Sequence, residues 1–225
     1  MGVHDGHRQR MRKRFLEYGI ENFDDHNVLE MLLFYSNYRG DTNPIAHELI
    51  DHFGSFAAVF DAPIEELKTV KGVGENAALL IKLIPQVAKR YSISKDSYNN
   101  ILSDSESAGK YLLPRFFAEC EEVVYLVCLD AKCKVQKCQL LCRGGMDSAN
   151  VDIRKIVEIA LAYKSGRIII AHNHPGGIAL PSREDIETTR RLKNALRGVN
   201  IILADHIVVA NDDFVSMADS GYLNS

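Results

Sequence analysis

The stretch AHNHPGGIALPSRED, residues 171–185, decides the predicted fold, because it describes the end of a strand, a tight turn and the start of a helix. Side chains at positions i and i+2 of a strand point to the same face, so His172 and His174 are predicted to aim at one point. The proline that follows cannot continue a strand ladder and places the pair at the strand end. Ser182 begins the next helix, whose first turn can return the Asp185 carboxylate to the two imidazoles.

Two interpretations of this stretch are open. Two imidazoles and one carboxylate suit zinc, with a fourth position left for water, and such a centre can hydrolyse a bond. Alternatively, Ser182-x-x-Asp185 is close to a capping box, which would make both residues structural, and the histidines would be ordinary strand residues. Core packing requires no such combination of four polar groups at one strand end, and this favours the metal site.

The surrounding sequence alternates strands with helices. Two strands flank a turn at Asp130-Ala131, a helix is predicted over 148–164, and GRIIIAHNH forms a short buried strand. The helix that starts at Ser182 is predicted to close at Gly198, and further strands follow it. This order predicts an α/β domain.

The first part of the chain has a different pattern. Residues 1–90 carry apolar side chains at helical spacing, with Ser55 as a helix N-cap, and predict an all-α domain. Residues 91–103 are polar and rich in Ser and Asn, so a linker is expected there, with Ile101-Leu102 as a short apolar docking element. The α/β domain then covers residues 104–225.

The motif around the two histidines resembles a known one. His172-Asn-His174-Pro175, followed by Ser182 and Asp185, resembles the JAMM motif HxHPx6SxxD of MPN (or JAB) metalloproteases. The variant HNHPxG followed by PSxxD resembles the bacterial RadC family. The resemblance covers nearly the whole chain, and it implies a C-terminal JAMM/MPN domain with cytidine-deaminase-like layers.

Further segments support the resemblance, and two depart from it. Asp205-His206-Ile and Phe214-Val-Ser216 are similar to later strands of the RadC family. Gly176 stands where Ser is usual, which removes no ligand. The segment at 152–155 reads Asp-Ile-Arg-Lys, where many members carry His-Pro-Arg-Glu. That departure would matter only if the catalytic glutamate lay there.

The resemblance implies a metallopeptidase or isopeptidase that acts on a protein or peptide substrate. Zn²⁺ would be held by His172, His174 and Asp185. The glutamate that opens the first strand, Glu122, would be the general base, whereas an exposed glutamate at a strand edge can also be simply solvated. Ser182 would donate to the developing oxyanion.

His206 follows an aspartate on a predicted strand and has two possible roles. It could bind the metal or contact one of the metal ligands, or it could be a strand histidine with a structural hydrogen bond. The structural role is favoured, because three protein ligands and a water fill a catalytic zinc site.

The N-terminal half contains a second pattern, in which a helix ends, Lys71-Gly72-Val-Gly74 makes a tight turn, and a new helix begins. It resembles the helix-hairpin-helix motif, and its backbone amides could bind a nucleic-acid phosphate without reading bases. The alternative is a plain connection between two helices. The basic tract 7–14 is likewise either a nucleic-acid contact or the solvated face of a first helix.

Composition limits these functions. The net charge of −3 gives no global attraction to nucleic acid, so DNA contact would have to be local. No apolar run is long enough to span a bilayer, and the cytoplasm is the expected location. The five cysteines form no Cys-x-x-Cys pair and are expected to be reduced thiols near the hairpin.

Three functions therefore compete. The first is a zinc hydrolase. The second is a DNA-binding protein associated with repair or recombination, including a metal-dependent nuclease. The third is an interaction module with a vestigial metal site, and the complete set of His172, His174 and Asp185 argues against it.

Overall fold

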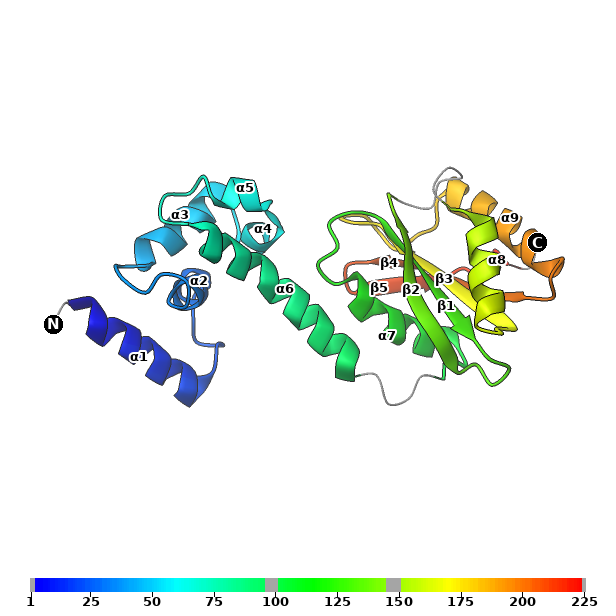
Figure 1. Cartoon of the computed structure of the whole chain (residues 1–225), viewed down its shortest axis with the longest axis horizontal. Coiled ribbons are helices and arrows are strands. Elements are labelled where there is room, and N and C mark those ends of the chain that lie inside the picture. Colours follow the sequence, from blue (N-terminus) through cyan, green and yellow to red (C-terminus); the bar gives the residue numbers. More distant parts are fainter. Residues whose placement is uncertain (1–2, 96–100, 145–150, 224–225) are drawn as a thin grey trace. The chain divides into compact units, whose positions relative to one another are not determined.

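The computed structural model describes residues 3–95, 101–144 and 151–223 (Figure 1). Contacts between residues divide the chain into two compact units, Met1–Ala88 and Lys89–Ser225. Within the described ranges, no helix combines the length and the apolar character needed to cross a membrane.

The first unit is helical throughout its regular structure and has its own core. Its apolar core consists of side chains that recur at helical spacing, including Leu29, Leu33, Leu49 and Ile81. The Ser55 hydroxyl caps a helix by accepting a hydrogen bond from the backbone N–H three residues later at 3.1 Å, as predicted. The helices are α1 (Val3–Tyr18), α2 (Asp25–Leu33), α3 (Asn43–Phe53), α4 (Phe56–Asp61), α5 (Ile64–Leu67) and α6 (Glu75–Lys95), the last of which ends in the second unit.

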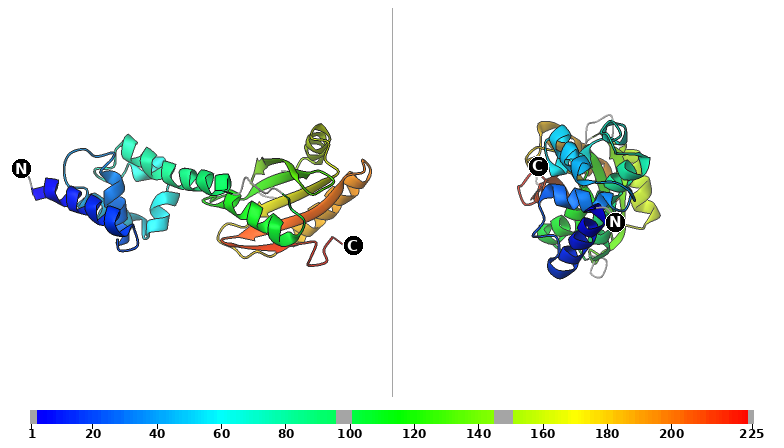
Figure 2. Two further views of the ribbon diagram at one scale, coloured as in Figure 1. Left: turned by 90° about the horizontal axis from the view of Figure 1, so that it is seen from below. Right: turned by 90° about the vertical axis from the view of Figure 1, so that its left-hand side faces the viewer.

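The second unit contains a mixed five-stranded sheet in the order β2-β1-β3-β4-β5. β3 and β4 are parallel, and the other neighbours are antiparallel. Figure 2 shows these strands side by side. In chain order, the elements are α7 (Ser105–Phe116), β1 (Val123–Leu129), β2 (Val135–Arg143), α8 (Ile153–Ala162), β3 (Arg167–Asn173), α9 (Arg183–Arg197), β4 (Ile202–Ala210) and β5 (Asp213–Ser216).

Helices cover both faces of this sheet, which explains the apolar runs in its central strands (Figure 1). Alternate residues of β3 enter different cores. Ile168 and Ile170 pack with residues of α8 and α9, whereas Ile169 and Ala171 pack with residues of α7. This alternation assigns the next residue of the first series, His172, to the face that α8 and α9 cover.

The predicted linker 91–103 is wrong in its first part, because residues 91–95 continue α6. They contain no glycine or proline that would end a helix, so the helix extends past the polar composition. Residues 96–100 lie outside the described part. Ile101 then pairs with Lys134 and Leu102 is buried, which is the predicted apolar docking element.

The start of α8 and the end of α9 can be compared with the helix ends predicted from the sequence. α8 begins at Ile153, and residues 148–150 of the predicted helix are not among the described residues. α9 closes at Gly198 as predicted, but this glycine is right-handed, and the left-handed residue of that turn is Asn200. The turn therefore uses an asparagine, one of the few residues that adopt this conformation readily.

Candidate metal centre

The end of β3 positions the two histidines. His172 lies opposite Val124 of β1, and it is almost completely buried. His174 follows the last residue of β3, yet its backbone N–H still donates to the Val209 carbonyl of β4 at 2.8 Å. The strand-like alignment therefore continues through His174, and the two imidazoles share one face, as the spacing predicts.

The start of α9 positions the carboxylate. Ser182 is the N-cap and accepts a hydrogen bond from the Asp185 backbone N–H at 3.0 Å, while the Asp185 carboxylate accepts from the Ser182 N–H at 2.7 Å. This is the capping box that the sequence offered as the alternative to a metal site. The two interpretations are compatible, because the capping geometry orients the same carboxylate toward the histidines.

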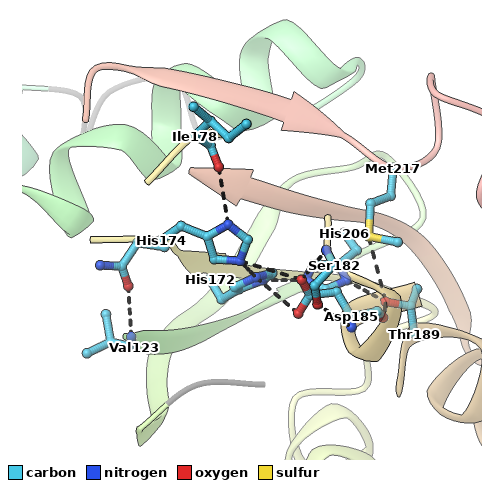
Figure 3. A network of polar contacts seen from close by, with 10 residues as sticks. Val123, His172, His174, Ile178, Ser182, Asp185, Thr189, His206 and Met217 are labelled. Carbon is cyan, nitrogen blue, oxygen red and sulfur yellow. Dashed lines mark hydrogen bonds and ion pairs between the residues drawn. The ribbon is translucent and has the colours of Figure 1, made fainter. Parts of the chain in front are cut away.

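The three side chains converge (Figure 3). The Nε2 atoms of His172 and His174 are 2.9 Å apart. The Asp185 carboxylate lies 3.2 Å from the first of these atoms and 3.5 Å from the second. All three ligand atoms lie within 4.8 Å of one another, and among the described residues this is the one group of three or more His, Cys, Asp or Glu side chains with that property.

The centre is rich in electron pairs. Burial by itself raises the pKa of Asp185, but the adjacent His172 and the hydrogen bond from the Ser182 backbone N–H outweigh it, and the pKa is lowered below its ordinary value. His174 Nδ1 lies 3.2 Å from the Ile178 carbonyl oxygen, which can only accept. The proton of the neutral imidazole is therefore on Nδ1, and the Nε2 lone pair faces the centre. These donors fit a divalent cation such as zinc.

Behind the centre lie two further buried side chains. His206 of β4 is fully buried, and its Nε2 lies 2.8 Å from His172 Nδ1. Its Nδ1 lies 2.5 Å from the Thr189 hydroxyl on α9. Burial holds the pKa of His206 well below its ordinary value. His206 is thus outside the convergent group, but it is hydrogen-bonded to His172, a member of that group. Contact with a ligand is the role that the sequence did not favour for this histidine.

Thr189 is a site residue that the sequence analysis did not identify. It lies four residues after Asp185, on the same face of α9, and its hydroxyl donates to the Asp185 carbonyl at 2.5 Å. The i, i+4 spacing is visible in the sequence, but every helix contains many such pairs, and only the position of His206 on β4 distinguishes this threonine.

Glu122 stands one residue before β1 and is exposed. Val124 lies opposite His172, and Glu122 comes two residues before Val124. Strand alternation therefore puts Glu122 on the same face of the sheet as Val124 and His172. Its carboxylate is not part of the convergent group. Asn173, which the sequence analysis did not single out, holds this segment, because its side chain accepts from the Val123 N–H at 2.7 Å and donates to the Glu121 carbonyl at 3.0 Å.

The predicted nucleic-acid residues lie in the first unit, in the loop between α5 and α6, where Lys71, Gly72 and Gly74 are exposed. Gly72 has φ +94°, and a Cβ there would lie 2.6 Å from Ile45. A Cβ on Gly74 would meet nothing within 4 Å. The fold therefore requires glycine at the first position, whereas packing inside this chain does not require it at the second.

Known proteins match nearly the whole chain. Residues 102–222 match the model of the RadC-like JAB domain. UPF0758 protein FN0909 of Fusobacterium nucleatum subsp. nucleatum is 31% identical over 227 residues, and the match covers 97% of this chain and 97% of that protein. The convergent histidines and aspartate lie inside the matched domain, and the chain belongs to the RadC family, with a JAB domain in its second unit.

Proposed function

We propose that this protein is a zinc-dependent hydrolase that cleaves amide bonds, as a metallopeptidase or isopeptidase. One observation carries the proposal: two imidazole Nε2 atoms and a carboxylate converge within 4.8 Å at the end of β3. Two neutral imidazoles and one carboxylate form a typical donor set for catalytic zinc, and they leave a fourth position for substrate or water.

In the proposed mechanism, the Nε2 atoms of His172 and His174 and the Asp185 carboxylate hold the ion. When bound, zinc supplies a Lewis acid that polarises a carbonyl oxygen and acidifies water. Glu122, on the same face as the histidines, accepts a proton from the attacking water and passes it to the leaving amine. The Ser182 hydroxyl accepts from Asp185 N–H, so its own proton is available to donate to the oxyanion.

The surroundings of the centre support a protein substrate over a nucleic acid. The loop between His174 and Ser182 exposes two large apolar side chains, with Ile178 68% and Leu180 56% exposed. Apolar side chains beside a reactive centre suit a peptide, whereas a polyanionic backbone requires cations. We infer that this loop contacts apolar residues of the substrate next to the scissile amide.

Metal content measured by plasma mass spectrometry tests the metal centre first. We expect about one zinc per full-length wild-type chain, and loss of this zinc in His174→Ala. His52→Ala is the matched control, because His52 is exposed in the first unit, and it should retain the metal. Wild-type protein that takes up no zinc after chelation and reloading would refute the proposal.

A peptide-cleavage assay then tests the chemistry. A library of peptides and isopeptide-linked peptides with apolar residues beside the amide should be cleaved by the wild type. Glu122→Gln should retain zinc but lose at least about 100-fold in rate, the usual contribution of a general base. Equal rates in this variant and the wild type would remove Glu122 from the mechanism.

A second candidate function, DNA binding by a helix-hairpin-helix in the first unit, is favoured by Gly74. Since packing does not require glycine there, its lack of a side chain would keep the α6 backbone amides open to a phosphate. The basic tract 7–14 gives weaker support for DNA binding. Its Arg8 donates hydrogen bonds to the carbonyls of Asn37 and Gly40 and so helps to hold the fold of the first unit. Gly74→Ser keeps a capping residue, and it should weaken salt-sensitive DNA binding while leaving stability unchanged.

A further inference from the structure

The hydrogen bonds behind the metal centre contain a fixed number of protons. The Thr189 hydroxyl has one proton and three neighbours, the Asp185 carbonyl oxygen at 2.5 Å, His206 Nδ1 at 2.5 Å and the Met217 sulfur, a weak acceptor, at 3.7 Å. The carbonyl carries no proton, and two oxygens at this distance need one between them. The hydroxyl proton must therefore point to the carbonyl, and the hydroxyl oxygen must accept from the imidazole.

The direction of the Thr189 hydrogen bonds also determines which ring nitrogen of His206 carries the proton. If Thr189 accepts, His206 Nδ1 carries the proton. His206 is fully buried, and the two hydrogen-bond partners of its ring, His172 Nδ1 and the Thr189 hydroxyl, carry no negative charge that would balance a second ring proton. Its Nε2 is consequently a bare acceptor, 2.8 Å from His172 Nδ1.

The tautomer of His206 in turn determines the tautomer of His172 in the metal centre. A bare Nε2 on His206 requires His172 to donate from Nδ1, and a neutral His172 then has its lone pair on Nε2. That atom faces His174 Nε2 at 2.9 Å and the Asp185 carboxylate at 3.2 Å (Figure 3). The bonds run in one direction, from His172 through His206 and Thr189 to the backbone of Asp185.

We propose that Thr189 and His206 are positioning residues that hold His172 as the Nδ1–H tautomer and so direct its Nε2 lone pair at the metal. His174 has a separate partner, the Ile178 carbonyl, so the two histidines are set independently. The inference rests on the proposed metal centre, but it concerns the metal-free protein as well, because these bonds exist without an ion.

Nitrogen-15 NMR of the metal-free, full-length protein tests the tautomer directly. The His172 resonances are assigned by their absence in His172→Gln. We expect the proton of wild-type His172 on Nδ1 and a bare Nε2. A proton on Nε2, hydrogen-bonded to Asp185, would overturn the proposal whether or not the protein binds zinc. This result and a failure of the proposed function are therefore distinguishable.

Zinc affinity of three threonine variants tests the consequence. Thr189→Val keeps the shape but removes the hydroxyl, and it should weaken zinc binding roughly 10- to 100-fold, as loss of a ligand's hydrogen-bond partner does. Thr189→Ser should bind as the wild type does. Thr188→Val is the matched control, because Thr188 is the neighbouring buried threonine outside this series of bonds, and its affinity should not change.

Two results of the affinity series would contradict the proposal. One is wild-type affinity in Thr189→Val. The other is an equal loss in Thr189→Val and Thr188→Val, which would reflect general damage to α9. Thermal unfolding of each metal-free variant separates a loss of affinity from a loss of folded protein.

Discussion

At the scale of single residues, Asp185 meets two requirements with one side chain. Its carboxylate closes the capping box of α9 and also faces the two imidazoles of the metal centre. Capping brings the carboxylate to the helix N-terminus, where a negative charge is favoured. The cap therefore orients a ligand at little additional cost.

Ser182→Ala should accordingly have two effects. Loss of the N-cap should lower the free energy of unfolding by about 1 kcal/mol, and zinc affinity should fall because Asp185 is less well held. Ser55→Ala is the control, because it removes a comparable cap from α4 in the first unit. Urea unfolding and zinc titration of both variants check this. A similar drop in zinc affinity in both would contradict it.

Gly72 illustrates a different constraint, a left-handed backbone. Gly72→Ala should lower the free energy of unfolding by about 1–2 kcal/mol, because φ is +94° and an added Cβ would press on Ile45. Gly74→Ser, two positions away in open space, is the control and should be neutral. Urea unfolding measures both, and equal stability of Gly72→Ala and the wild type would rule out this strain.

At the scale of elements, the segment before β1 is fixed from two sides. Asn173 holds residues 121 and 123 by two hydrogen bonds. Earlier in the chain, Glu119 joins Lys89 of α6 at 2.5 Å and Arg143 of β2 at 2.8 Å. Together these contacts define where Glu122 emerges, although none of them touches the metal centre.

The Glu119 cluster predicts a pH dependence of stability. Burial alone raises the pKa of Glu119, but Lys89 and Arg143 outweigh it, and the pKa is lower than its ordinary value. A group whose pKa is depressed by folding stabilises the fold above its unfolded pKa, about 4.3, and loses this contribution as the pH falls through the folded value. The contribution should therefore be complete at pH 7 and decline below about pH 4.

Glu119→Gln removes that contribution. We expect a loss of about 2 kcal/mol at neutral pH, between the values for exposed and buried pairs. The difference from the wild type should shrink as the pH falls below about 4. Urea unfolding of both proteins between pH 3 and 7 provides the measurement, and a difference that stays constant over this range would refute the assignment.

At the scale of the whole molecule, the two units have separate apolar cores. The core of the first unit contains residues from α2 to α6, and the cores of the second lie on the two faces of the sheet. The metal centre lies entirely in the second unit. A bound ion should therefore stabilise the second unit alone.

Calorimetry with and without zinc tests this separation. Two thermal transitions are expected, and zinc at about 100 times its dissociation constant should stabilise one of them by about 2.7 kcal/mol. A chelator should reverse the shift, and His174→Ala should abolish it. Equal shifts of both transitions would mean that the units do not unfold independently.

Several features follow from local sequence alone, because short spacings determine them. Strand alternation puts His172 and His174 on one face, and helix geometry puts Ser182 and Asp185 within one turn. The helical first unit and the α/β second unit follow from apolar periodicity in the same way. These relations span at most a few residues, so no knowledge of the rest of the chain is needed.

Tertiary structure decided the rest, because it depends on which strands pair and in which register. His206 reaches His172 only because β4 pairs in parallel with β3, and the Asn173 side chain reaches the Val123 N–H from 50 residues away along the chain. Thr189 acquires its role only when α9 packs over that pair of strands. Local periodicity is the same for any strand order, so partners of this kind are set by the packing of the whole sheet.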